Sequence, residues 1–409
     1  MKDSGIDWIG KIPDEWKIEK GKRIFAQRNE RGNKINLELL SPTQKYGVIP
    51  QTLYEELTTY SAVKLKEGTD LSQLKTVHKG DYCISLRSFQ GGFEYSKYEG
   101  VVSPAYQIFY AIKNIDECYY KYLFKDQTFI AKMNSFTMSL RDGKNIAFSD
   151  FGNTYIPLPP LSEQTKIANF LDKKCAQIDS IIEESKKSIE EYKSWKQSMI
   201  FEAVTGKNNR KKWKQEKLKY LADYNIESLS EETNGDFNFD YIDIGSVKFG
   251  EGIISKENMN FKVAPSRARR IVKEGDVIIS SVRTYLRAIA KIEKSDVPQI
   301  VSTGFVVFTP KKEKITSDFL YYAISSENLI EQVESNSVGI SYPAINAIDI
   351  VNFKIPLPSI KEQEEIVIEI DAKCAQIDSL ISEKQSLIKD LAEYKKSLIF
   401  EAVTGKRRV

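Results

Sequence analysis

The sequence predicts an α+β protein built from two similar mixed domains, each followed by one long helix. A stretch that begins at Ile156 and ends at Lys207 recurs from Ile355 to Lys406, and the two copies align without a gap. Both copies carry apolar residues at the spacing of a heptad repeat. The blocks before the two copies share short motifs, although most of their residues differ. An internal repeat this long indicates a chain of two halves made from the same parts.

Each copy of the repeat predicts one helix with a defined start and end. The prolines of IPLPP at 156–160 cannot lie inside a helix, so the first helix begins after them. We expect Ser162 to be the N-cap and Gly206 to follow the last turn. At 1.5 Å per residue, such a helix spans about 60 Å.

The apolar positions of each helix follow alternating steps of four and three residues. The first seam consists of Leu171, Cys175, Ile178, Ile182, Ser185, Ile189, Tyr192, Lys196, Met199 and Ala203. The second consists of Ile370, Cys374, Ile377, Ile381, Lys384, Ile388, Leu391, Lys395, Leu398 and Ala402. Two positions are polar in both seams, which weakens a coiled coil but fixes its register. Because both stripes are narrow and equally long, we expect the helices to pack on each other rather than each on its own domain.

The block 1–155 predicts a mixed domain. Short apolar runs such as 82–86 and 101–112 are broken by Gly, Pro and Asn, which is typical of strands joined by turns. The best helical candidate is the segment 117–133.

The block 208–354 repeats traces of the first block. KGDYCISLRS at 79–88 is echoed by EGDVIISSVRT at 274–284, and VVSPAYQIF at 101–109 by IVSTGFVVF near 300–308. We therefore expect two domains that share a scaffold and differ at the surface, so that each recognises something different.

Composition excludes several classes of function. The 409 residues contain one histidine, His78, which rules out multi-histidine metal sites and most histidine-dependent catalysis. Four cysteines without CxxC spacing indicate reduced, intracellular thiols, and the first residues do not form a signal peptide. The net charge of +3 is small, so any nucleic-acid surface depends on clustered basic residues.

An enzymatic alternative, either a stand-alone methyltransferase or a nuclease, lacks its motifs. An adenine methyltransferase needs a glycine-rich cofactor turn after a strand and an (Asp/Asn)-Pro-Pro-aromatic motif, but the Pro-Pro at 159–160 follows a leucine. The sequence GIDWIGK at 5–11 matches most of a phosphate-binding loop, but the next residue is Ile12 instead of a metal-binding hydroxyl. We expect no catalytic residues and no metal site in this chain.

Four motifs appear in order along the whole chain: the opening DSGIDWIGKIPDEW, two IPLP…EQ helix starts, an AQIDS core in each helix and two FEAVTGK endings. In these motifs the chain resembles the DNA-specificity (S) subunit of type I restriction–modification systems. The resemblance implies two target-recognition domains separated by two long helices, packed as an antiparallel coiled coil with pseudo-two-fold symmetry. It divides the chain into a first target-recognition domain at 1–155, a first conserved helix at 156–207, a second domain at 208–354 and a second helix at 355–409.

The same resemblance implies a non-catalytic, cytoplasmic subunit that recognises a bipartite DNA site, one half-site per domain. Two modification (methyltransferase) subunits and restriction subunits, which act as ATP-dependent translocase and nuclease, would be its partners. S-adenosylmethionine, ATP and magnesium would belong to those partners, and this chain would hold no cofactor. The alternatives are a coiled-coil scaffold and a specificity module of another DNA methylation or defence complex without a restriction subunit.

Candidate DNA contacts follow the two Gly-Asp turns, precede the two helices, or form a basic cluster in the second block. Arginine suits bidentate contact with guanine and glutamine suits adenine, while both also bind phosphate. The candidates are Arg87, Ser88, Gln90, Arg141, Lys144 and Asn145 in the first domain, and Arg269, Arg270, Arg283, Tyr285, Arg287, Ser341 and Tyr342 in the second. For each of them, DNA contact and a role inside the fold both remain open.

Overall fold

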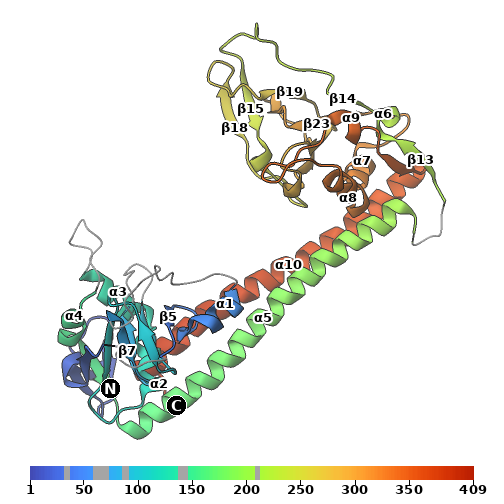
Figure 1. The fold of residues 1–409 in the computed structure, drawn as a ribbon. Helices are drawn as coiled ribbons and strands as arrows, with labels where there is room; N and C mark the ends of the chain where they lie inside the picture. Colours follow the sequence, from blue (N-terminus) through green and yellow to red (C-terminus); the bar gives the residue numbers. More distant parts are fainter. Residues whose placement is uncertain (32–36, 59–72, 85–91, 137–145, 208–211) are drawn as a thin grey trace. The chain divides into compact units, whose positions relative to one another are not determined.

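A computed structural model describes residues 1–31, 37–58, 73–84, 92–136, 146–207 and 212–409 (Figure 1). The chain divides into two compact units. Unit 1 comprises Met1–Ser185 and Ser386–Val409, and unit 2 comprises Lys186–Gln385. Each unit therefore combines a mixed domain with part of each long helix.

An antiparallel four-stranded sheet with the same order of strands lies in both units. In unit 1 the order is β4-β11-β8-β9, and in unit 2 it is β14-β23-β20-β21. The strands of unit 1 are β4 (Phe25–Arg28), β8 (Tyr82–Ile84), β9 (Phe93–Tyr95) and β11 (Gln107–Ala111). Those of unit 2 are β14 (Ala222–Tyr224), β20 (Val277–Ser280), β21 (Ile289–Lys291) and β23 (Phe305–Pro310). The echoes in sequence thus correspond to equivalent strands.

The other strands differ between the units. Unit 2 has a second sheet in the order β18-β15-β22-β19, in which β15 and β22 run parallel. The described part of unit 1 has the two-stranded pairs β5–β6 and β7–β10. These strands are β5 (Leu40–Thr43), β6 (Gly47–Pro50), β7 (Lys75–Val77), β10 (Gly100–Val102), β15 (Asn238–Ile242), β18 (Glu257–Asn260), β19 (Ala268–Val272) and β22 (Gln299–Ser302). Further elements are β1 (Lys2–Asp3), β2 (Lys11–Ile12), α1 (Gln51–Thr58), α6 (Leu218–Leu221), β16 (Val247–Lys248) and β17 (Gly252–Ile253).

Three short helices follow the shared sheet in each unit. They are α2 (Glu117–Leu123), α3 (Gln127–Ser135) and α4 (Phe148–Asn153) in unit 1, and α7 (Ser317–Ile324), α8 (Glu327–Ser335) and α9 (Ala347–Ile350) in unit 2. The expectation of one helix over 117–133 is therefore wrong. Asp126 is buried, and its carboxylate accepts hydrogen bonds from the amides of Thr128 and Phe129, at 2.9 and 3.1 Å. This N-cap starts a new helix where the apolar pattern alone continues the old one.

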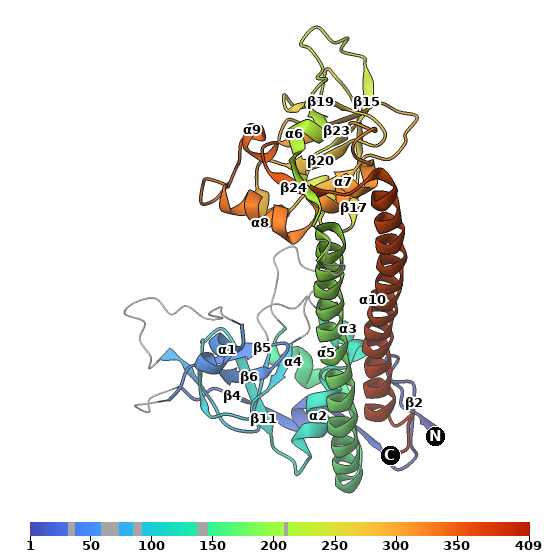
Figure 2. The same cartoon turned by 90° about the vertical axis from the view of Figure 1, so that its right-hand side faces the viewer.

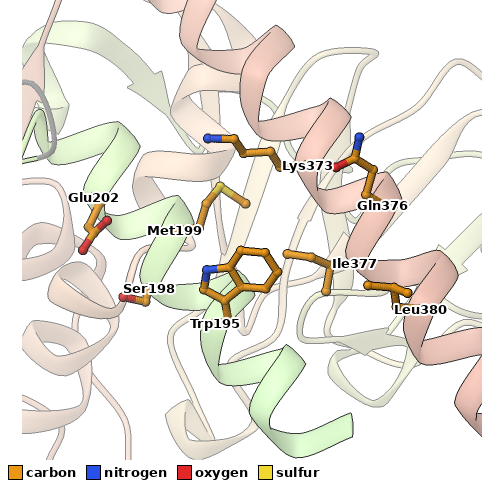
Figure 3. Close-up of a pocket in the computed structure, with 8 residues that line it drawn as sticks. All are labelled: Trp195, Ser198, Met199, Glu202, Lys373, Gln376, Ile377 and Leu380. Carbon is orange, nitrogen blue, oxygen red and sulfur yellow. The ribbon is translucent and has the colours of Figure 1, made fainter. Parts of the chain in front are cut away.

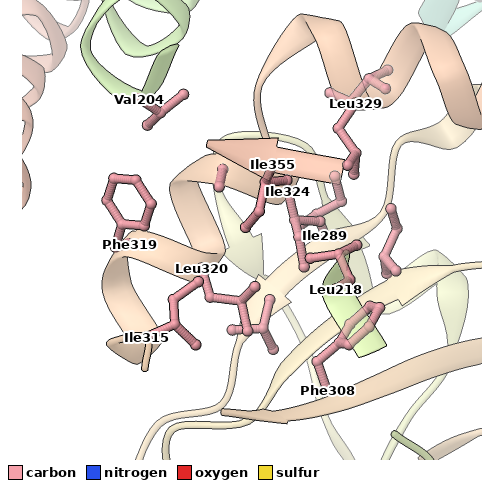
Figure 4. Packing of buried hydrophobic residues seen from close by; sticks show 14 of the residues in the cluster. Val204, Leu218, Ile289, Phe308, Ile315, Phe319, Leu320, Ile324, Leu329 and Ile355 are labelled. Atoms are coloured by element: carbon pink, nitrogen blue, oxygen red, sulfur yellow. The ribbon is translucent and has the colours of Figure 1, made fainter. Parts of the chain in front are cut away.

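The shared sheets of the two units pack into cores of different composition. In unit 1, Phe25, Phe109 and Phe151 pack with ring centroids 4.9 to 5.7 Å apart. In unit 2, Leu218, Ile289 and Leu320 belong to a cluster that is mainly aliphatic (Figure 4). Full burial of one such side chain contributes about 1.5–3 kcal/mol, so both compositions can stabilise the scaffold.

The helices α5 (Leu161–Thr205) and α10 (Ile360–Val403) lie side by side (Figure 2). In unit 1 the start of α5, with Leu171, shares a core with the end of α10, with Leu398. In unit 2 the end of α5, with Val204, shares a core with the start of α10, with Ile370. This pairing confirms the predicted antiparallel coiled coil and, with the two mixed domains, the predicted α+β class.

The polar seam lysines form ion pairs across the coiled coil. Lys395 Nζ lies 2.6 Å from Asp179 in unit 1, and Lys196 Nζ lies 2.7 Å from Asp378 in unit 2. Each aspartate belongs to an AQIDS motif. The same pair of motifs therefore fixes the register of the helices in both units.

The ends of the helices agree only in part with expectation. The glycine after α5, Gly206, has a φ of 71°, which confirms its role at the helix C-terminus. The first helix, however, starts at Leu161, and the amide of Glu163 donates to the carbonyl of Pro160 at 2.9 Å. Ser162 thus lies inside the first turn, and the expectation that it is the N-cap is wrong.

A buried glutamine fastens each long helix to its mixed domain. The Oε1 atom of Gln164 accepts a hydrogen bond from the amide of Asp116, and that of Gln363 accepts one from the amide of Thr316, both at 2.8 Å. Their amide nitrogens donate to the carbonyl oxygens of Pro159 and Pro358, at 2.9 and 3.1 Å. The IPLP strands β12 (Tyr155–Leu158) and β24 (Lys354–Leu357) also pair with β3 (Lys17–Lys20) and β13 (Lys214–Lys217).

Candidate DNA interface

The two Gly-Asp turns have the same geometry. Gly80 has a φ of 95° and Gly275 a φ of 86°, a conformation that favours glycine. The carboxylates of Asp81 and Asp276 accept hydrogen bonds from backbone amides three residues earlier, both at 2.8 Å. Burial raises the pKa of Asp276. These turns position β8 and β20, which lead into the two candidate loops.

The candidates of the first domain cannot be placed. Arg87, Ser88 and Gln90 after β8 lie outside the described residues, and so do Arg141, Lys144 and Asn145. Their assignment therefore stays a prediction. The structure places all seven candidates of the second domain.

After β20 the chain forms a short 3-10 turn, η5 (Thr284–Leu286), flanked by two arginines in the left-handed conformation. Arg283 has φ 52° and ψ 49°, and Arg287 has φ 50° and ψ 40°. Residues other than glycine adopt this region at a cost of about 1–3 kcal/mol, and they do so mainly where surrounding contacts or function require it.

The two arginines have different surroundings. Arg287 donates from Nε and Nη2 to the carboxylate of Glu334, at 2.8 and 3.1 Å, and from Nη1 to Glu327 at 3.2 Å. Hydrogen bonding to Glu334 raises the pKa of Arg287. Arg283 is exposed and stacks over the ring of Tyr342, with its guanidinium carbon 5.2 Å from the ring centroid. The structure thus gives Arg287 a role inside the fold and leaves Arg283 directed to solvent.

The loop before the second long helix joins η5. The amides of Val338 and Ala344 each donate to the other residue's carbonyl oxygen, at 2.8 and 3.0 Å, which closes a hairpin. The hydroxyl of Thr284 donates to that of Ser337 at 2.9 Å. Through these bonds the structure brings Arg283, Tyr285, Ser341 and Tyr342 onto two connected loops, with all four side chains exposed. We call this surface the recognition platform, together with Leu286, Val338 and Ile340.

The basic cluster at the start of β19 belongs to the other sheet of unit 2. Arg267 pairs with Asp243 at 2.7 Å, and Arg269 stacks on Phe261 at 4.7 Å from the ring centroid. Arg270 is partly buried, and its Nε has no hydrogen-bond partner among the described residues. Burial without such a partner lowers the pKa of Arg270.

A groove between the helices was not anticipated from the sequence. Its volume is about 380 Å³, and Figure 3 shows side chains from α5 and α10 facing one another across it. Trp195, Met199 and Glu202 of α5 line it with Lys373, Ile377 and Leu380 of α10, among others. Trp195 is 56% exposed. The equivalent residues of unit 1, Tyr394 and Ile181, are also exposed. The signal in the sequence was the aromatic residue at the same off-seam position of both copies.

The described residues include no group of three or more His, Cys, Asp or Glu side chains that could hold a metal ion. Likewise, no helix in the described ranges is long and apolar enough to cross a membrane.

Comparison with known proteins agrees with this architecture. A family described as "Type I restriction modification DNA specificity domain" matches residues 11–191 and 197–390. The type I restriction enzyme MjaVIII specificity subunit of Methanocaldococcus jannaschii is 28% identical over 296 residues, which cover 67% of this chain and 68% of that protein. The EcoBI specificity subunit of Escherichia coli is 26% identical over 300 residues, covering 68% and 63%. The chain thus spans about two thirds of the length of these curated relatives.

Two solved structures share the fold. One comes from a study of complex assembly and conformational transition of the type I R-M system, with a TM-score of 0.73, 17% identity, and coverage of 97% of this chain and 100% of that one. The other is the HsdS subunit from Thermoanaerobacter tengcongensis, with a TM-score of 0.58, 16% identity and full coverage of both chains.

Proposed function

Because this chain belongs to the family of type I restriction–modification DNA specificity subunits, we propose that it recognises a bipartite DNA site and directs partner methyltransferase and restriction subunits to it. Each mixed domain reads one half-site. In this proposal the chain is a non-catalytic subunit, and S-adenosylmethionine, ATP and magnesium are bound by the partner subunits.

One observation supports a bipartite site above all. The Gly-Asp turn, the shared sheet and the glutamine that fastens the helix recur in both units. The sequences that leave β8 and β20 differ, with SLRSFQG after one and SVRTYLR after the other. A scaffold that is kept while its loops change is suited to hold two different recognition surfaces.

The test is to map methylated adenines in DNA exposed to the chain together with its modification partner. We expect a methylated sequence in two defined parts with an unspecified spacer between them, and no methyl transfer or cleavage by the chain alone. A continuous recognition sequence, or methyl transfer from S-adenosylmethionine by the partner-free chain, would refute the proposal. If the same methylation is found and no restriction subunit associates with the complex, the alternative of a specificity module in a complex that only methylates is favoured.

The groove of Trp195 is our candidate for docking the modification subunit. A related exposed surface with an aromatic residue occurs in both units, as expected when two copies of one partner bind one chain. Exposed aromatic residues beside a hydrophobic groove commonly dominate protein–protein binding.

We therefore expect Trp195→Ala to weaken the binding of one of two modification subunits by about tenfold, a loss of about 1.4 kcal/mol. Tyr394→Ala should weaken the other. Stoichiometry measured by analytical ultracentrifugation at limiting partner concentration reports the change. Ile368→Ala is the matched control, because Ile368 is exposed on α10 but does not line the groove. Unchanged stoichiometry in both aromatic variants would exclude this surface.

A further inference from the structure

The hairpin of the recognition platform ends in an apolar tip. Val338, Ile340 and Tyr342 are 80, 103 and 68% exposed. Single exposed apolar residues are common on protein surfaces, but a contiguous set marks an interaction site. These three occupy alternate positions of one short hairpin, and Tyr285 and Leu286 of the connected turn η5 are exposed as well.

Backbone hydrogen bonds fix the hairpin to the neighbouring part of unit 2. Its base is closed by the two backbone hydrogen bonds between Val338 and Ala344, and the amide of Ile345 donates to the carbonyl of Ser281 at 2.8 Å. Gly339 has a φ of 117°, and a Cβ atom there would approach the carbonyl oxygen of Tyr342 to 3.0 Å. The turn that presents Ile340 therefore depends on this glycine.

The charges around the tip indicate its partner. Arg283 stacks on Tyr342, and no described carboxylate forms a hydrogen bond or an ion pair with the guanidinium of Arg283. Ser341, whose side chain is exposed, lies between Ile340 and Tyr342 in the sequence and offers a hydroxyl. An apolar tip flanked by a free guanidinium and a hydroxyl matches a surface that mixes methyl groups with hydrogen-bonding groups and negative charge.

Building on the proposed function, we infer that Ile340 contacts the 5-methyl group of a thymine in the major groove of the half-site read by unit 2. The major groove presents this methyl group beside base-edge acceptors, and the minor groove presents no methyl group. Arg283 and Ser341 are placed to form hydrogen bonds with the polar edges of nearby bases or with nearby phosphates. Ile340 then adds apolar selection for an A·T pair, a contact that charged candidates alone cannot supply.

The experiment compares duplexes that carry the mapped methylation site, with each thymine of this half-site replaced singly by uracil. Uracil lacks only the 5-methyl group. Burial of one such group corresponds to roughly fourfold in affinity. We expect the wild-type chain with its modification partner to lose about fourfold at one position. Ile340→Ala should bind the thymine duplex about fourfold more weakly and be insensitive to uracil at that position.

The control is Val263→Ala, because Val263 is an exposed apolar residue of unit 2 outside the recognition platform. It should behave as the wild type. The inference fails if Ile340→Ala binds with wild-type affinity or if this half-site contains no A·T pair. It also fails if, at every position, the affinity lost through Ile340→Ala adds to the affinity lost through uracil. If binding is insensitive to uracil and 2-aminopurine fluorescence increases, the bases are unstacked. Ile340 would then be a wedge between base pairs instead of a contact to a methyl group. If the wild-type complex shows no preference for the mapped site, the proposed function itself fails.

Discussion

Replacing Arg283 by glycine should weaken binding to the half-site of unit 2 by about 10- to 100-fold while leaving the chain stably folded. A good base contact contributes about 1–3 kcal/mol of discrimination. Glycine adopts the left-handed backbone of this position without strain, so the variant loses the guanidinium but no backbone stability. Fluorescence anisotropy against duplexes altered in one half-site, at fixed salt, measures the effect.

Arg287→Gly is a closely matched control. It lies in the same turn and has the same backbone conformation, but its side chain is paired with Glu327 and Glu334. We expect this variant to lower the thermal stability of unit 2, because two carboxylates lose their cation. If Arg283→Gly weakens binding to all sequences equally, the guanidinium binds phosphate and does not read a base. By the sequence equivalence of the loops, Arg87→Ala should affect the other half-site.

Lys125→Met should destabilise unit 1 by about 3 kcal/mol at neutral pH. Lys125 Nζ lies 2.6 Å from both carboxylate oxygens of Glu94, whose side chain is 1% exposed. Removing the cation leaves a buried carboxylate without its charge partner, which is among the costliest single changes in a protein. Hydrogen exchange of amides in β9 and α3 measures the loss within unit 1.

The pH dependence of this variant follows from the same carboxyl. Burial raises the pKa of Glu94 even with Lys125 present. The folded state then binds the proton more tightly than the unfolded chain, so stability decreases as pH rises from the unfolded pKa to the folded one. Without Lys125 the folded pKa rises further, so the penalty should shrink on acidification. Lys121→Met, which removes a pair with the exposed Asp172, should cost less than about 1 kcal/mol at any pH. Equal losses in both variants would contradict the buried-charge explanation.

The long helices could be predicted from sequence because their signal is local and repeated. A heptad seam can be recognised from residues of one helix alone, and the second copy of the repeat shows the same seam independently. The break at Asp126 was missed because an apolar pattern continues across it, and only the capping carboxylate reveals the interruption. The polar run of Lys125, Asp126 and Gln127 was the available signal.

The candidate site was harder to predict because its partners are distant in sequence. Arg283 and Arg287 look alike in the chain, yet Glu327 and Glu334, which separate their roles, lie 40 and 47 residues after Arg287. The stretch 339–343 is a candidate from sequence, but an exposed isoleucine cannot be told from a buried one without the fold, so the sequence selects Ser341 and Tyr342 there and not Ile340. The groove of Trp195 was not predicted because a heptad pattern constrains only the seam positions, and Trp195 lies beside the seam.

The glutamines that fasten the helices have a consequence for how such chains diversify. Among the described residues, Gln164 and Gln363 bind backbone amides and carbonyl oxygens and no side chain. An attachment of this kind places little demand on the residues of the attached domain. The aromatic core of one domain and the aliphatic core of the other show how far those residues can drift while the attachment persists. The two helices and their glutamines therefore form a constant joint, to which domains of quite different sequence can be attached.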